Sequence, residues 1–153
     1  MNFLELRIPP PLVALIHGAL MWVIAPLGPV LDVPESARIA GALVIFAGGL
    51  AVAIAGIISF RLAKTTVNPL KPETATSLVS SGIFGVTRNP MYLGLLLALL
   101  AWTLYLSSPV ALLGPVAFWL YITRFQIIPE ERAMTKLFGN SFAAYCAKVR
   151  RWI

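Results

Sequence analysis

The chain has 153 residues, of which 59% are hydrophobic and only 12% are charged. This composition, with a mean hydropathy of +0.86, excludes an ordinary soluble domain and indicates a single membrane-embedded domain, 1–153. The net charge is +6, but the basic residues flank apolar segments, so we expect the lipid bilayer as partner and no nucleic acid. The single cysteine, Cys146, excludes an internal disulfide, and no Cys and His spacing indicates a metal site.

Two long apolar segments occupy the first part of the chain. Between Ile8 and Leu31 the only ionisable residue is His17, and between Ile39 and Phe60 there is none. A bilayer crossing needs about 20 apolar residues. We therefore predict membrane spans at about 9–31 and 39–60.

Two features inside these spans have structural interpretations. Small residues recur in the second span at Ala47, Ala51 and Ala55, with Gly48, Gly49 and Gly56 nearby, and such a stripe lets another helix approach closely. His17 lies midway along the first span, where an ionisable group usually faces the bundle interior. We expect it to be neutral and hydrogen-bonded to a neighbouring helix.

A third apolar segment must fold back on itself. The 35 residues between Arg88 and Arg124 carry no charge, and as one helix they would extend about 50 Å. The hydrocarbon core is only about 30 Å thick. The sequence Ser107-Ser108-Pro109 favours a turn, which predicts a third span at 90–106, a fourth at 109–128 and a C-terminal helical tail at 129–153.

The basic residues divide unequally between the two sides of this arrangement. Eleven of the twelve fall on the side of the amino terminus, the 61–89 loop and the tail, and only Arg38 falls on the other. Loops rich in Lys and Arg remain in the cytoplasm. We therefore expect an all-α integral membrane protein with four transmembrane helices, a cytoplasmic loop, a C-terminal interfacial helix and both termini in the cytoplasm.

The first polar segment whose residues are suited to binding or catalysis runs from Thr76 to Tyr92. In a purely structural interpretation, Asn89 caps the third span and Pro90 occupies its first position. In a functional interpretation, the free N–H groups of this helix start and the Arg88 guanidinium form a site for a carboxylate or phosphate. The residues alone leave both interpretations open.

The second polar segment begins at Ile128-Pro129-Glu130-Glu131-Arg132. The two adjacent acids could simply complement the dipole of the tail helix. They could also hold a cationic ligand or accept hydrogen bonds from ribose hydroxyls.

Together these segments resemble the isoprenylcysteine carboxyl methyltransferase and phospholipid methyltransferase superfamily, in its bacterial branch. The resemblance covers roughly 68–153. It rests on Arg88-Asn89-Pro90-Met91-Tyr92-Leu93-Gly94, Glu130-Glu131, Phe138-Gly139, Tyr145 and Val149-Arg150-Arg151-Trp152. Lys148 stands where the eukaryotic members carry arginine.

The resemblance implies a membrane methyltransferase with S-adenosyl-L-methionine in a cytoplasm-facing pocket and a lipophilic small molecule or lipid as acceptor. It places the protein in the bacterial inner membrane. The acceptor group is a carboxylate, a thiol or an amine. By resemblance, the cofactor-binding residues are Thr76, Ser77, Leu78, Val79, Phe84, Asn89, Pro90, Met91, Tyr92 and Glu130, and the catalytic residues are Arg88, Glu131, Lys148 and Arg151.

A non-catalytic scaffold and a small transporter subunit are the alternative functions. A proton-coupled transporter would be expected to carry an acidic residue inside the membrane. No Asp or Glu lies within the four predicted spans, which favours the enzyme.

Overall fold

The computed structural model describes residues 3–65 and 70–153, and over these ranges the chain is helical with no strand. Asn68, where the family resemblance begins, lies outside the described residues. The main helices are α1 (Pro10–Ile24), α2 (Glu35–Leu62), α3 (Pro90–Leu106), α4 (Leu113–Ile122) and α5 (Ile128–Lys148). Short 3-10 turns occur at Ala25–Leu27, Pro72–Thr74, Gly82–Gly85 and Pro109–Leu112, and a π-helical segment at Thr123–Ile127.

Most of the predicted spans agree with these helices. The third span has the predicted bounds, 90–106, and is apolar with 17 residues. Three further described helices are long and apolar enough to cross a membrane, Pro10–Leu27, Glu35–Leu62 and Pro109–Lys148. The first is shorter than the predicted 9–31, because the chain leaves the helix after Leu27, and the second extends beyond 39–60 at both ends.

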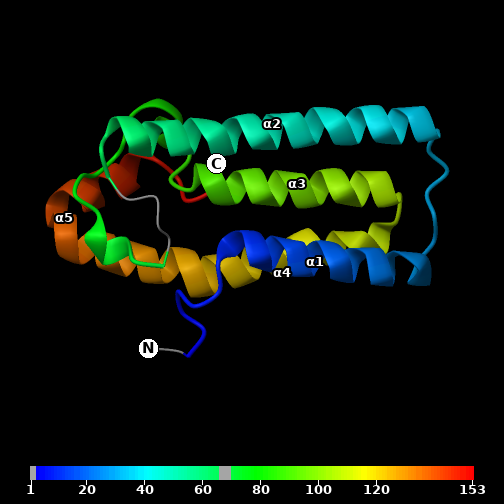
Figure 1. Cartoon of the computed structure of the whole chain (residues 1–153), viewed down its shortest axis with the longest axis horizontal. Coiled ribbons are helices and arrows are strands. Elements are labelled where there is room, and N and C mark those ends of the chain that lie inside the picture. Colours follow the sequence, from blue (N-terminus) through cyan, green and yellow to red (C-terminus); the bar gives the residue numbers. More distant parts are fainter. Residues whose placement is uncertain (1–2, 66–69) are drawn as a thin grey trace.

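The predicted turn after the third span is present. Ser107 ends α3 in the left-handed conformation, with φ of 52°. Its hydroxyl donates to the Leu31 carbonyl over 2.9 Å, and the Ser108 hydroxyl donates to the Ala25 carbonyl over 2.9 Å. These bonds fix the turn against the loop after α1, at the right-hand end of Figure 1.

Helix α3 lies in the middle of the bundle, with α2 on one side and α1 and α4 on the other (Figure 1). Of the small residues predicted to let a helix approach α2, Gly49 and Gly56 do face α3, whereas Ala47 and Ala51 are exposed. The face of α2 that meets α3 carries Ala42, Gly49 and Gly56 at seven-residue spacing. This spacing keeps one narrow face of a helix on its neighbour.

The chain remains helical beyond residue 128, where the fourth span was predicted to end and the tail to begin. The helix continues from Pro109 to Lys148 through the π-helical segment, and it is interrupted only at Gly139, where φ is 48° and ψ is −122°. About 20 residues suffice for a crossing. We therefore take Pro109–Ile128 as the membrane-crossing part, and α5 from Pro129 onward as the part that lies outside the hydrocarbon.

The amino-terminal segment is bound to the π-helical segment. The Leu6 N–H donates to the Phe125 carbonyl over 3.0 Å, and Gln126 Nε2 donates to the Ile8 carbonyl over 2.8 Å. The Glu5 carboxylate accepts hydrogen bonds from Arg124, over 3.0 Å, and from Arg132. The Arg124 and Arg132 guanidinium groups hold the pKa of Glu5 below its usual value.

His17 does face the bundle interior, between the rings of Phe118 and Tyr121 of α4. Its predicted bond to a neighbouring helix is wrong. Its Nδ1 lies 2.8 Å from the Val13 carbonyl one turn earlier in its own helix, because that carbonyl is within reach of a side chain four residues later.

Candidate functional site

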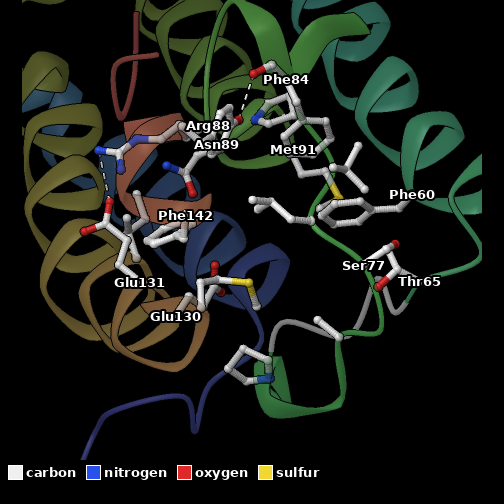
Figure 2. A pocket seen from close by; sticks show the side chains of 18 of the residues that line it. Phe60, Thr65, Ser77, Phe84, Arg88, Asn89, Met91, Glu130, Glu131 and Phe142 are labelled. Atoms are coloured by element: carbon white, nitrogen blue, oxygen red, sulfur yellow. Dashed lines mark hydrogen bonds and ion pairs between the residues drawn. The ribbon is translucent and has the colours of Figure 1, made fainter. Parts of the chain in front are cut away.

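One end of the bundle contains a cavity between the loop that precedes α3 and helix α5 (Figure 2). Its volume is about 870 Å³, including the part that opens to the outside. The walls are Phe60, Thr65, Pro72, Ala75, Ser77, Leu78, Val79, Phe84, Arg88, Asn89, Pro90, Met91, Tyr92, Ile127, Glu130, Glu131, Met134, Phe142 and Tyr145.

The two polar segments that the sequence singled out therefore meet in space. All of the predicted site residues line this cavity except Thr76, Lys148 and Arg151. The Thr76 hydroxyl donates to the Lys64 carbonyl over 3.2 Å, which ties the loop to the end of α2. Lys148 is exposed at the end of α5. Arg151 lies behind the cavity wall, where it contacts Glu131.

Glu131 is the centre of a charged cluster. Its carboxylate accepts two hydrogen bonds from Arg151, over 3.0 and 2.7 Å, and lies 3.2 Å from Arg88 NH2. Two oxygens facing one guanidinium is the strong, geometrically specific form of this interaction. The hydrogen bond from Arg151 to Glu131 raises the pKa of Arg151 further. Arg88 also contacts the Cys146 sulfur.

The start of α3 is joined to the segment after α5 by the backbone as well. The Arg88 N–H donates to the Arg150 carbonyl over 3.1 Å, and Asn89 Nδ2 donates to the Arg151 carbonyl over 2.8 Å. Asn89 does occupy the N-cap position, followed by Pro90, but its side chain makes no capping bond. The Asn89 amide holds the two chain segments together instead. The Arg88 guanidinium faces Glu131 and therefore does not form a free site for an anion.

Tyr92 and Glu130 join the two segments inside the cavity. The Tyr92 hydroxyl donates a hydrogen bond to the Glu130 carboxylate. Burial raises the pKa of Glu130 to about 8, because a charged carboxylate is poorly solvated there. Glu130 therefore holds its proton at neutral pH, while its neighbour Glu131 lies between two arginines.

The opposite wall is aromatic, and most of it was not among the predicted site residues. Phe60, at the end of α2, stacks on Phe84 with ring centroids 4.8 Å apart. The Tyr145 hydroxyl donates to the Phe84 carbonyl over 2.7 Å, and burial raises the pKa of this tyrosine to about 12. Figure 2 shows Phe60 and Met91 across the cavity from Phe142 and Glu130.

Sequence reasoning missed Phe60, Phe142 and Tyr145 as site residues for different reasons. Phe60 lies outside both polar segments that the sequence singled out, so no local signal marks it. Tyr145 belongs to the family pattern, and its three-residue spacing from Phe142 places both on one helix face. That spacing is the signal that could have identified the pair.

A helical membrane bundle with an enclosed, mixed polar and aromatic site at one end is the class of protein that these features define. Residues 37–141, more than half of the chain, match the phospholipid methyltransferase family. The chain belongs to this family, which implies a methyltransferase that acts on lipid-type substrates.

An uncharacterized protein of Haemophilus influenzae is 51% identical over 63 residues, which are 41% of this chain and all of that protein. No solved structure matches the chain.

Proposed function

We propose that this protein transfers a methyl group from S-adenosyl-L-methionine to a lipophilic or amphiphilic acceptor at the cytoplasmic edge of the membrane. The observation that carries the proposal is the Tyr92–Glu130 hydrogen bond inside one cavity. It joins the two segments whose motifs resemble the superfamily. The proposal would fail if these segments belonged to separate surfaces.

The cavity walls fit such a methyl donor in chemistry. The Phe60–Phe84 stack and Met91 provide apolar surface for a flat nucleobase. In the described chain, no backbone N–H from Ser77 to Gly82 donates to another backbone group, so this loop has donors available for a ligand. The carboxyl groups of Glu130 and Glu131 are suited to hydroxyl and ammonium groups.

In the proposed reaction, bound S-adenosylmethionine supplies a methyl group that is activated by the adjacent sulfonium. Methyl transfer requires the donor and the acceptor to be held close and in line, with water excluded. The described residues are suited to this role. Arg88, Glu131 and Arg151 fix one wall, and the aromatic residues keep the opposite wall apolar.

The two acids differ in their surroundings, which bears on whether either could accept a proton. An amine acceptor must lose a proton, whereas a carboxylate or thiolate does not. Glu131 is held by two arginines. Glu130, with its pKa raised to about 8, carries its proton in most molecules at neutral pH, so it can act as a general base only in the fraction of molecules in which it is ionised.

The donor is tested by calorimetric titration of the detergent-solubilised protein with S-adenosylmethionine and S-adenosylhomocysteine. We expect both to bind, and we expect Tyr92→Phe and Arg88→Ala to weaken binding. Lys136→Ala is the matched control, because Lys136 is an exposed residue of α5 outside the cavity. If the unmodified protein binds neither ligand, the scaffold or transporter alternatives take precedence.

The acceptor and the orientation need separate measurements. Transfer of a labelled methyl group from S-adenosylmethionine into membrane lipids, compared between the unmodified protein and Tyr92→Phe, identifies a lipid acceptor. Reporter proteins fused after residue 153 and within the 28–34 loop test the orientation. We expect the first reporter in the cytoplasm and the second outside it, and the reverse result would place the site on the other face.

A further inference from the structure

A second hollow lies at the opposite end of the bundle, on the side of α3 that α2 covers only in part. It is lined by Ile39, Ala42, Leu43 and Phe46 of α2 and by Ala98, Ala101, Trp102 and Tyr105 of α3. Its lining is apolar, and its volume is about 770 Å³ including the open side. We call it the α2–α3 groove. It shares no residue with the cavity described above.

The shape of the groove comes from small residues between larger ones. Ala42, Ala98 and Ala101 leave space between the helices, while Phe46 and Tyr105 are exposed. Trp102 is held in place, because its indole N–H donates to the Gly18 carbonyl of α1 over 3.1 Å and its ring stacks on Tyr105. The α3 wall of the groove is therefore held in place at Trp102, and the open side of the groove faces the surrounding lipid.

A cationic side chain stands at one end of the groove. Arg38 is four residues before Ala42, which places both on one face of α2. Its NH1 donates to the Tyr105 carbonyl over 3.2 Å, but its buried Nε has no hydrogen-bond partner. Arg38 forms no ion pair with an acidic residue in the described part of the chain. A guanidinium has five N–H donors in a fixed plane, so this one retains the capacity to bind an anionic oxygen.

An acidic side chain lies beside this arginine. Glu35 is three residues before Arg38 and therefore lies on the same helix face, although the two form no ion pair. Asp32 lies in the loop just before. A ligand with a phosphate on Arg38 and a positive group near Glu35 would complement both charges, whereas a second negative charge would be repelled.

We propose that the α2–α3 groove binds one zwitterionic phospholipid from the surrounding bilayer. An acyl chain lies along Ala42, Ala98 and Ala101, the phosphodiester binds Arg38, and the headgroup amine faces Glu35. A second copy of the chain is the less suitable occupant. Close packing between membrane helices requires small residues on the contacting surface, and the rims of this groove carry Leu43, Phe46 and Tyr105.

Native mass spectrometry of the delipidated protein in detergent, with phosphatidylethanolamine added, tests the proposal. We expect one retained lipid per chain. Loss of a charge-assisted hydrogen bond should weaken retention in Arg38→Ala by about tenfold. Arg61→Ala is the matched control, because Arg61 is an exposed arginine at the other end of the same helix. Equal retention by Arg38→Ala and Arg61→Ala would overturn the proposal.

Three further arms separate the parts of the ligand. Diacylglycerol, which lacks the phosphate, should bind to the unmodified protein as weakly as phosphatidylethanolamine binds to Arg38→Ala. Phosphatidylglycerol should bind more weakly than phosphatidylethanolamine, and Glu35→Gln should reduce this preference. Equal binding of the two phospholipids would overturn the zwitterionic assignment.

A groove variant keeps the test independent of Arg38. Ala42→Leu fills the groove and leaves the arginine in place, so retention should fall while the helical circular dichroism stays unchanged. A folded Ala42→Leu protein that retains the lipid normally would show that the acyl chain lies elsewhere. A dimer that excludes the lipid would assign the groove to a second copy of the chain and overturn the proposal.

Discussion

Two neighbouring glycines of α2 provide a direct test of how closely α2 and α3 approach. A Cβ atom at Gly49 would lie 2.8 Å from Leu97 Cβ and 2.9 Å from the Gly94 carbonyl oxygen. Neither atom is the end of a flexible side chain, so the helices would have to separate by about half an ångström to reach an ordinary contact of 3.4 Å. A Cβ atom at Gly48 would meet nothing within 4 Å.

The two alanine variants should therefore differ in stability by the cost of this clash alone. Alanine favours the helix over glycine by a similar amount at both positions, about 0.5–1 kcal/mol. Forcing an extra carbon into a close-packed contact costs about 1–3 kcal/mol. In a chain of this size, 1 kcal/mol shifts the Tm by about 2–4 °C, so a clash of about 1–3 kcal/mol should make Gly49→Ala unfold about 2–12 °C below Gly48→Ala.

Thermal unfolding in detergent measures this difference, with a thiol-reactive dye that reports the exposure of Cys146, the single cysteine of the chain. Circular dichroism of the same samples checks that the dye follows helix loss. Equal Tm values for the two variants would contradict the α2–α3 contact. A Gly48→Ala protein less stable than the unmodified one would show that the exposed face of α2 also has a packing partner.

Three further variants test the charged groups. Glu131→Gln should destabilise the protein by about 1–2 kcal/mol in thermal unfolding, since it removes charge-assisted hydrogen bonds in a partly exposed cluster; an unchanged Tm would contradict the role of the cluster. The unmodified protein should lose stability as the pH rises from 4.5 through about 8, because the folded protein keeps the Glu130 proton that the unfolded chain releases. The profile of Tm against pH for Glu130→Gln should lack this loss. Parallel profiles for the two proteins would refute the raised pKa of Glu130. Because the pKa of Glu5 is lowered, its stabilising effect is present above pH 4.5 and is lost as the pH falls below that value. Glu5→Gln should therefore flatten the acid side of the profile of Tm against pH. A profile as steep as that of the unmodified protein would count against the bonds from Arg124 and Arg132 to Glu5.

The sequence predicted the parts of the fold that depend on composition and turn chemistry. Charge-free segments of sufficient length identified the spans, and Pro90 and Ser107 marked the ends of α3. The packing face of α2 was predicted only in part, because many of its residues are small and only tertiary contact shows that Gly49 and Gly56 face α3 while Ala47 and Ala51 do not. The continuation of the helix through Pro129 was also missed, since this proline follows a π-helical segment without breaking the helix.

For the site, the family pattern supplied the residues and the fold supplied their pairing. The pattern brought Tyr92 and Glu130 to attention, but no spacing rule shows that one donates to the other across 38 positions. The sequence also could not predict that the two adjacent acids have different surroundings. This difference depends on burial for Glu130 and on two arginines from distant segments for Glu131.

The ties from Arg88 and Asn89 to Arg150 and Arg151 also set the order in which the protein can be assembled during translation. Asn89 and its partner Arg151 are 62 positions apart. At about 5–20 residues per second, Arg151 is therefore synthesised roughly 3–12 s after Asn89. The carboxylate that pairs with Arg88 belongs to Glu131, 43 positions later, so for the first part of this interval the nascent chain carries the Arg88 guanidinium without its counter-charge. Insertion of α3 must therefore rely on water or lipid headgroups as temporary counter-charges, and closure of the wall is a late, post-insertion event.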